Sequence, residues 1–239
     1  MISFDEMWKK IEKYLHVDNA LEQGFSNGKY TRELAKYAKK VVGIDLSEDF
    51  YNMTKENLKD LDNVELKIMD ATKMDFEDKS FDVLLNTSFH EFDLSGGEVY
   101  SLDLDLKRRI LEEMTRVSDC IIFVEPTENA VTNELFKVFN PNENHSDRIQ
   151  KSNELINEVL QENGYTLVES GLTYNRDEFK TQDELEQEML DWWADIKVPS
   201  NDEERTEMIQ QIDEVLESAG MLKDLQVTEE IRYKVLRRI

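Results

Sequence analysis

The spacing of apolar residues predicts alternating strands and helices along most of the chain. An apolar stripe at three-and-four spacing predicts a helix within residues 1–17 that covers another element; it contains Phe4, Met7, Trp8, Ile11, Tyr14 and Leu15. Short apolar runs predict strands at residues 19–24, 39–45, 63–70, 81–92 and 120–126, and amphipathic spacing predicts helices at 29–39, 47–61 and 106–117. This alternation is typical of a mostly parallel sheet with helices on both faces.

The last third of the chain departs from strict alternation. A helix that stops at Gly164 is followed by a strand, and residues 181–220 then contain two helices separated by Pro199. A final strand follows residue 224. We therefore expect an α/β fold in a single domain over residues 1–239, with a cover helix at 1–17 and a helical insertion at 181–220 before the last strand. Insertions at a sheet edge often cover a substrate site.

Charge limits the range of partners. The 239 residues include 53 Asp and Glu against 29 Lys and Arg, which gives a formal net charge of -24. Such a field repels phosphate backbones and anionic lipid surfaces, so nucleic acid is a disfavoured partner. No segment has the roughly 20 apolar residues of a membrane helix, and the N-terminal residues lack the pattern of a secretory signal. We expect a cytoplasmic protein. Its single cysteine, Cys120, is expected in the core.

A glycine-containing turn after the first predicted strand is the clearest candidate for binding a ligand. A dinucleotide-binding turn needs glycine at the first, third and sixth positions, which counted from Gly24 are Gly24, Ser26 and Lys29. Two of these three positions, Ser26 and Lys29, do not hold glycine. Counting instead for the first, third and fifth positions gives Gly24, Ser26 and Gly28, with the acidic residue Glu22 two positions before the first.

This second pattern resembles the first motif of class I S-adenosylmethionine-dependent methyltransferases, of the kind grouped as types 11 and 25. The resemblance continues in register through residues 20–125: the second strand ends at Asp45 and Leu46, the third at Asp70 and Ala71, and the fourth at Asn86. Ser26 stands where the family has its middle glycine. The resemblance implies a seven-stranded Rossmann-like sheet, S-adenosyl-L-methionine as cofactor and methyl transfer to a small-molecule oxygen, nitrogen or carbon.

The residues that the resemblance assigns to the cofactor lie near the carboxyl ends of the predicted strands or in the turn after the first strand. They are Glu22, Gly24, Ser26, Gly28, Asp45, Leu46, Asp70, Ala71 and Asn86. Ligands of open parallel sheets bind beyond the carboxyl ends of the strands. A carboxylate at Asp45 can accept both hydroxyl donors of a ribose. Glu22 could instead be a surface acid, and Asp70 could simply form a turn.

His90 is the candidate catalytic base. A histidine just beyond the fourth strand would suit a hydroxyl acceptor, although it could also only shape the pocket. Tyr14, His90, Trp192 and Trp193 are the candidate substrate residues. The two tryptophans are neighbours on a helix and point about 100° apart, so either one faces the cleft or both pack inside the insertion. No histidine pair has metal-ligand spacing, and we expect no metal.

Two other functions fit parts of the pattern. A non-catalytic module could keep the fold and contact a protein partner through its acidic surface; Ser26 favours it. An NAD-dependent oxidoreductase is disfavoured by Lys29 at the sixth position of the turn. The sequence does not identify the methyl acceptor or the oligomeric state.

Overall fold

The computed structural model describes residues 2–87, 89–92, 102–142, 144–194 and 196–239. Within these ranges the strands form one sheet in the order β1-β7-β8-β6-β5-β2-β3-β4. The strands are β1 (Ile2–Ser3), β2 (Asn19–Gln23), β3 (Lys40–Asp45), β4 (Val64–Ile68), β5 (Val83–Asn86), β6 (Cys120–Pro126), β7 (Tyr165–Glu178) and β8 (Gln226–Arg238).

All pairings in the sheet are parallel except those of β8, which runs antiparallel to both β6 and β7. The prediction of a mostly parallel, seven-stranded, doubly wound sheet is confirmed. Strand β1 adds a two-residue pairing at the edge, where Ile2 and Ser3 lie beside Thr173 and Tyr174 of β7. The parallel strands bring their carboxyl ends to one edge of the sheet.

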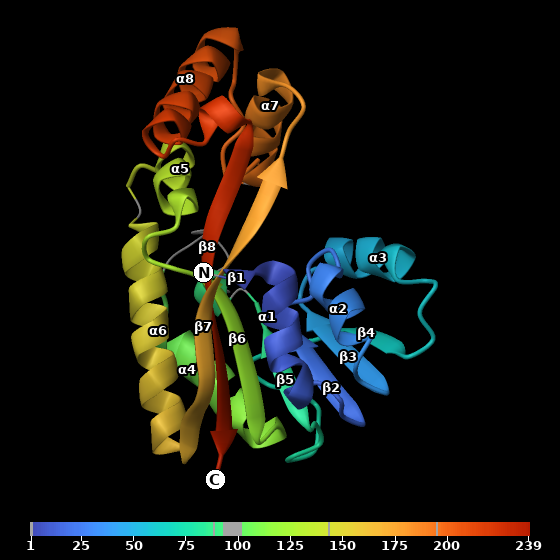
Figure 1. The fold of residues 1–239 in the computed structure, drawn as a ribbon. Coiled ribbons are helices and arrows are strands. Elements are labelled where there is room, and N and C mark those ends of the chain that lie inside the picture. The colour runs from blue at the N-terminus through green and yellow to red at the C-terminus, as the bar shows by residue number, and fades with distance from the viewer. Residues whose placement is uncertain (1, 88, 93–101, 143, 195) are drawn as a thin grey trace.

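Helices cover both faces of the sheet (Figure 1). The helices α1 (Phe4–Ile11), α2 (Lys29–Leu34) and α3 (Glu48–Asn57) lie on one face, and α4 (Leu104–Val117) and α6 (His145–Glu162) on the other. At the N-termini of four of these helices, a polar side chain accepts a hydrogen bond from a backbone N–H group of the first turn, which would otherwise have no partner. These side chains belong to Ser3, Ser47, Asp103 and Asn144.

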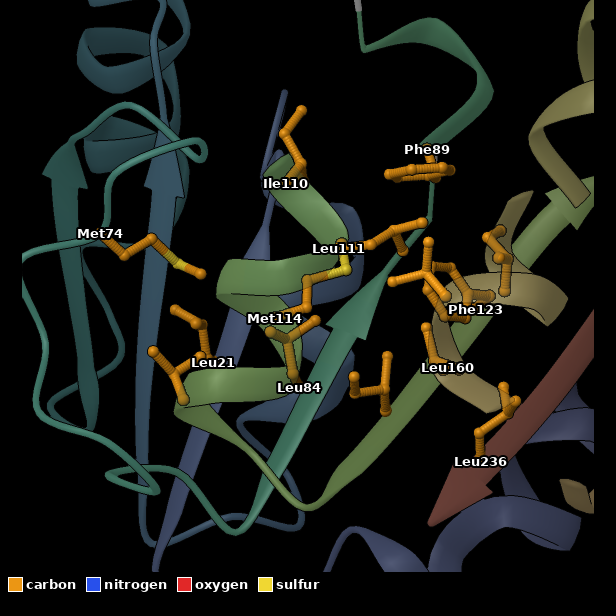
Figure 2. Packing of buried hydrophobic residues seen from close by; sticks show 14 of the residues in the cluster. Leu21, Met74, Leu84, Phe89, Ile110, Leu111, Met114, Phe123, Leu160 and Leu236 are labelled. Carbon is orange, nitrogen blue, oxygen red and sulfur yellow. The ribbon is translucent and has the colours of Figure 1, made fainter. Parts of the chain in front are cut away.

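The larger core lies between the sheet and α4 and α6. Leu111 and Met114 of α4 are completely buried and pack toward Leu84 of β5 and Phe123 of β6 (Figure 2). On the opposite face, Met7, Trp8, Ile11 and Leu15 form part of a second core over β2, β3, β5 and β6. The apolar stripe of the first helix therefore covers the sheet, as its spacing predicts.

A third core holds the helical insertion together. The antiparallel pair β7 and β8 extends beyond the parallel strands and carries α7 (Gln182–Trp192) and α8 (Asp202–Ser218) at its far end (Figure 1). Both helices pack with α5 (Val131–Phe139) through a cluster that includes Phe136, Met189 and Ile212. The insertion is thus anchored to the segment that follows β6, on the side of the carboxyl ends.

Some boundaries differ from the sequence prediction. Helix α2 ends at Leu34, and residues 35–39 form a tight turn in which Asn63 donates hydrogen bonds to the carbonyls of Ala35 and Ala38. Helix α5 was not predicted, because its apolar residues follow the stop at Pro126 so closely. In the described part of the chain, no helix combines the length and apolarity needed to cross a bilayer.

A pair of leucines tests the position of the core. Leu111→Ala is expected to lower the free energy of unfolding by about 2–5 kcal/mol, because Leu111 is fully buried and the truncation leaves a cavity. Leu167→Ala is the matched control, since this side chain on β7 is 50% exposed and should cost less than about 1 kcal/mol. Chemical denaturation measures both, and equal losses would contradict the assigned packing.

Candidate functional site

Polar and acidic residues at the carboxyl ends of four strands bound the candidate site. Gln23 ends β2, Asp45 ends β3, Asn86 ends β5 and Glu125 lies near the end of β6. Neighbouring parallel strands place these ends side by side, and β2 and β5 pair through Gln23 and Asn86. The site therefore forms where open α/β sheets bind their ligands.

The turn after β2 has a left-handed backbone at three positions. Gly24, Ser26 and Gly28 have φ angles of 78°, 44° and 83°. Serine tolerates this region less well than glycine, yet Ser26 keeps the turn closed. Its backbone N–H donates to Asp45 Oδ2 over 3.1 Å, and its carbonyl accepts from the Thr54 hydroxyl. Ser26 therefore replaces the expected glycine without opening the turn.

Asp45 links two loops through its carboxylate. Oδ2 accepts from the Ser26 N–H, and Oδ1 accepts from the Ser47 N–H over 2.9 Å. Carboxylate oxygens can each accept more than one hydrogen bond. Asp45 can therefore hold the loops after β2 and β3 and still accept hydrogen bonds from a ligand.

A cavity of about 120 Å³ lies beside this carboxylate. Its described lining residues are Gln23, Gly24, Ile44, Asp45, Leu46, Met69, Ala71, Glu91, Phe92 and Ile110. The side chain of Leu46 is 45% exposed and offers an apolar wall to a ligand. Of the predicted cofactor residues, Gly24, Asp45, Leu46 and Ala71 meet in this lining.

Phe92 lies directly over the glycine turn. A Cβ atom on Gly24 would be 2.9 Å from Phe92 Cζ, so the aromatic ring and the backbone of the turn are in close contact. Small-molecule sites usually have volumes of about 300–1,000 Å³, and the cavity is smaller than this range. The contact between Phe92 and Gly24 closes the cavity at this end.

Asp70 and Asn86 have structural partners in the structure. Asp70 Oδ1 accepts hydrogen bonds from the backbone N–H and the hydroxyl of Thr72, over 2.8 and 2.7 Å, which forms the turn after β4. Asn86 Nδ2 donates to Gln23 Oε1 over 3.1 Å. Gln23 is 1% exposed, and its Nε2 has no partner within the described part of the chain. Because Gln23 also lines the cavity, this amide is available to a ligand.

Glu22 is fully buried beneath the glycine turn. Neither of its carboxyl oxygens has a hydrogen-bond partner among the described residues. Burial raises the pKa of Glu22 to about 8; the nearby Thr31 hydroxyl opposes this shift and the charge of Asp45 adds to it. The carboxyl group is therefore largely protonated at neutral pH in the free protein.

His90 and Glu125 form a buried pair at the next strand ends. His90 lies in the short helix η2 (Phe89–Glu91) and is 4% exposed, and its Nδ1 is 2.6 Å from Glu125 Oε2. Burial alone would lower the pKa of His90. The charge of Glu125 and the hydrogen bond to it together outweigh burial, so that the pKa is raised above its ordinary value.

Lys107 supports the same short helix from α4. Its side chain is completely buried, and Nζ donates to the carbonyl oxygens of Phe89 and His90 over 2.5 and 3.0 Å. Glu125 accepts from the backbone N–H groups of the same two residues. Buried Glu125 therefore binds the backbone N–H groups of this turn, and buried Lys107 binds its backbone carbonyl groups.

Three candidate substrate residues lie away from the cavity. Tyr14 is at the opposite end of the strands, where its hydroxyl donates to Glu169 over 3.2 Å and its neighbours include Asp82 and Cys120. The helix stripe that suggested Tyr14 gave no information on which end of the sheet it reaches. Cys120 begins β6 and is buried there, as expected.

Trp192 and Trp193 belong to the core of the insertion and not to the cavity lining. Trp193 packs against Phe136 and Phe139 with ring centroids 5.7 and 5.2 Å apart, and Trp192 packs edge-on against Trp193. Phe136 in turn stacks on His145, whose ring is 5.2 Å from that of His90. The tryptophans thus connect the insertion to the site only through other rings.

Sequence reasoning missed several residues of the site, namely Gln23, Phe92, Lys107, Ile110 and the pairing role of Glu125. The alternation of β2 could have indicated Gln23, because it shares a face with the buried Leu21. Among the described residues, no group of three or more potential ligands could hold a metal ion.

Comparison with known proteins assigns part of the chain to a family. Residues 20–118 match the family model described as a methyltransferase domain. The match contains the glycine turn, Asp45 and the first three strand ends of the site. Together with the strand order, it shows that residues 20–118 form a methyltransferase domain with the class I S-adenosylmethionine-dependent fold. The fold of this family implies S-adenosyl-L-methionine as the cofactor.

The individual relatives are distant. The chain is 31% identical over 115 residues to ribosomal RNA small subunit methyltransferase A of Clostridioides difficile (strain 630). The aligned segment covers 45% of this chain and 36% of the relative. The chain thus spans about a third of the length of that curated relative. A structure from Bacillus halodurans C-125, provisionally assigned as a methyltransferase, has a TM-score of 0.65, 18% identity and coverage of 98% of this chain and 97% of the other. The N-methyltransferase NodS from Bradyrhizobium japonicum WM9 has a TM-score of 0.53, 13% identity and coverage of 99% and 97%.

Two glycines with positive φ angles test the fit of the turn. In Gly28→Ala, the added Cβ would be 2.7 Å from Thr54 Cγ2, so we expect both backbone strain and a clash. In the control Gly164→Ala the φ angle is +78°, but the Cβ would meet no described atom within 4 Å. The control should cost about 1 kcal/mol in unfolding free energy and the Gly28 variant clearly more. Equal costs would contradict the close approach of α3 to the turn.

The buried Glu22 carboxyl gives a pH-dependent prediction. Its folded-state pKa of about 8 lies above the ordinary value of 4.5, so the folded protein holds a proton that the unfolded chain loses. Wild-type stability should therefore fall as pH rises from about 5 to 8, by up to about 1.4 kcal/mol for each unit of the pKa difference. Glu22→Gln should remove this loss, whereas the exposed control Glu48→Gln should follow the wild type. Parallel pH profiles for the wild type and Glu22→Gln, measured by denaturant unfolding, would show that Glu22 is not buried in this way.

Proposed function

We propose that this protein transfers the methyl group of S-adenosyl-L-methionine to a small-molecule acceptor. The observation that carries the proposal is the arrangement at the ends of β2 and β3. A left-handed glycine turn, a strand-end carboxylate and a part-apolar cavity lie together there. The bound cofactor would supply an activated methyl group on a cationic sulfur, so the task left to the protein is to bind, align and exclude water.

The donor and acceptor groups of the site suit this cofactor. Asp45 can accept hydrogen bonds from ribose hydroxyls, and Leu46, Ala71 and Ile110 offer apolar walls for an adenine ring. The methionyl end needs acceptors for its ammonium group and donors for its carboxylate. Glu22 and the Gln23 amide are buried groups without partners among the described residues, and both lie at the turn.

Glu22 also predicts how binding depends on protons. A nearby ammonium group would lower the pKa of Glu22 from about 8, so a protein that is largely protonated there at pH 7 would release a proton on binding. Cofactor affinity should therefore increase between pH 6 and pH 8. The cavity also has to enlarge, and the contact between Phe92 and Gly24 is the part of its wall that would have to open.

A small molecule is the acceptor class that the charge favours. The net charge of -24 opposes binding of a ribosomal RNA, whatever the substrates of the distant relatives. The aligned part of those relatives covers 45% of this chain at most, so it says little about the acceptor. We further propose that the insertion formed by α7 and α8 covers the acceptor side, because β7 and β8 carry it beyond the carboxyl ends (Figure 1).

Replacement of Asp45 tests the cofactor site. Asp45→Ala is expected to weaken binding of S-adenosylhomocysteine by about 10- to 100-fold in calorimetric titration, because hydrogen bonds to a charged group are lost. Asp49→Ala is the control: it removes the same charge from the exposed first turn of α3 and should leave affinity within about twofold. Thermal unfolding verifies that both variants fold. A folded Asp45→Ala variant with wild-type affinity would contradict the site.

The acceptor class requires a separate experiment. Wild-type protein is incubated with S-adenosyl-L-methionine carrying a radiolabelled methyl group and with panels of small alcohols, phenols, amines, thiols and carboxylic acids, beside a ribosomal RNA fraction. Labelled small-molecule product with unlabelled RNA is the expected result. Label found in the RNA alone would overturn the small-molecule assignment while leaving the cofactor site intact.

A further inference from the structure

The buried carboxylate of Glu125 has an unusual number of hydrogen-bond partners. Oε1 accepts from the Phe89 N–H over 2.5 Å, and Oε2 accepts from the His90 N–H over 3.1 Å. The ring Nδ1 of His90 is 2.6 Å from the same Oε2. Glu125 is only 3% exposed, and it lies 35 residues or more from these partners along the chain. Sequence separation and burial make this contact a product of the tertiary fold.

These contacts define which nitrogen of His90 carries the proton. The two backbone N–H groups are fixed donors, and together they favour the charged carboxylate, which can only accept. Nδ1 therefore has to be the donor in the 2.6 Å contact. In a neutral imidazole the other nitrogen, Nε2, is then an acceptor with a free electron pair. This orientation is the one that a carboxylate gives to the histidine of a hydrolase triad.

The short helix that contains His90 is held in place from both sides. Glu125 binds its N–H groups from β6, and Lys107 of α4 binds its carbonyl groups and lies 4.8 Å from the centre of the Phe89 ring. The next residues along the chain, Glu91 and Phe92, line the cavity beside Asp45. The residues that directly follow His90 therefore form part of the wall of the proposed cofactor site.

Charged groups from several elements surround the ring. Glu91 on the same turn has Oε1 3.7 Å from Nε2, and Glu229 of β8 interacts electrostatically with the ring. Lys107 of α4 opposes these acids, and His145 of α6 contacts the ring edge-on. The net effect favours a positively charged imidazole, so a proton arriving at Nε2 would be stabilised.

From this geometry we propose that Glu125 is a positioning residue that keeps the proton of His90 on Nδ1. The unprotonated Nε2 then receives the proton that the methyl acceptor loses. This proposal rests on the proposed methyl transfer. In that step an O–H or N–H bond of the acceptor breaks and its proton bonds to Nε2. In an alcohol, a phenol or a protonated amine, the electron pair of the broken bond forms the new bond to the methyl carbon; in a neutral amine the nitrogen lone pair forms that bond and the N–H proton leaves afterwards. In each case the sulfur–carbon bond breaks and its electrons stay on sulfur.

The arrangement also limits the class of acceptor. A base is useful only for an acceptor that has a proton to lose, such as a hydroxyl or an amine. Glu91, Glu125 and Glu229 give this region a negative field, which disfavours an acceptor that carries a carboxylate or phosphate beside the reacting atom. The acceptor is therefore a neutral or cationic alcohol, phenol or amine.

Ring nitrogen NMR tests the positioning role without any acceptor. The chain has only three histidines, so His90 can be assigned by comparison with a His90→Gln spectrum. Long-range proton–nitrogen spectra of the ¹⁵N-labelled protein should show a protonated Nδ1 and an unprotonated Nε2 above the pKa of His90, and that pKa should lie above 6.5. A proton on Nε2 would overturn the proposal.

Two variants separate positioning from simple support of the fold. Glu125→Gln should lower the pKa of His90 and lose the fixed tautomer, whereas Glu91→Gln should keep the tautomer and lower the pKa less. Titration with S-adenosylhomocysteine shows that each variant retains its cofactor site. If Glu125→Gln binds this ligand but leaves the His90 pKa and tautomer unchanged, the positioning role is wrong.

The pH dependence of turnover completes the test. With the alcohol, phenol or amine that is labelled in the acceptor panel, methyl transfer by the wild type should rise with pH through the pKa of His90. In Glu125→Gln the rate should be lower and this rise should move to lower pH; a rate profile that does not move would count against the base. Failure to bind S-adenosylhomocysteine would instead refute the proposed function, so the two failures are distinguishable.

Discussion

Carboxylates at strand ends hold the loops of this site, and the rest of the site depends on them. Parallel strands end with backbone N–H groups that have no partner in the sheet, and a nearby carboxylate can accept from two loops at once. Asp45 joins the loops after β2 and β3 in this way, and Glu125 fixes the turn after β5. The position of the glycine turn, the cavity wall and the His90 ring all follow from these two acids.

The buried acids also shift the pKa values of groups at the site. Exposed acids give the protein its net charge, but their fields are weakened by water. Glu22 and Glu125 are buried, where a charge is poorly solvated and acts more strongly on its neighbours than at the surface. One consequence is that the pKa of the Glu22 carboxyl is raised to about 8. Another is that the charge of Glu125 raises the pKa of His90.

The sequence predicted those parts of the site that depend on local structure. Gly24, Asp45, Leu46 and Ala71 lie at or just after strand ends, and Gly28 begins the helix after β2. Such positions can be recognised from apolar runs and turn residues. The alternation of strands and helices that makes the sheet mostly parallel was predicted for the same reason. Contacts between distant segments could not be predicted in this way: the binding of Lys107 to the turn at His90 depends on how α4 packs on the sheet. Tyr14 shows the same limit, because an apolar stripe predicts a buried helix face but not which end of the sheet it approaches.

The two halves of the chain have different relations to known proteins. The family match ends at residue 118, so it includes the cofactor half of the site. Glu125, Glu229 and the helices α5 to α8 lie beyond it. The cavity beside Asp45 thus lies within the matched segment, while the histidine–carboxylate pair depends on Glu125, which lies outside the match.

A crystal structure of the protein with S-adenosylhomocysteine tests the central claim most directly. The account predicts the adenine ring between Leu46, Ala71 and Ile110, the ribose hydroxyls on Asp45, the amino acid end at the turn near Glu22 and Gln23, and the Phe92 ring moved off Gly24. A ligand bound elsewhere, or a Phe92 ring still in contact with Gly24 beneath a bound ligand, would contradict it.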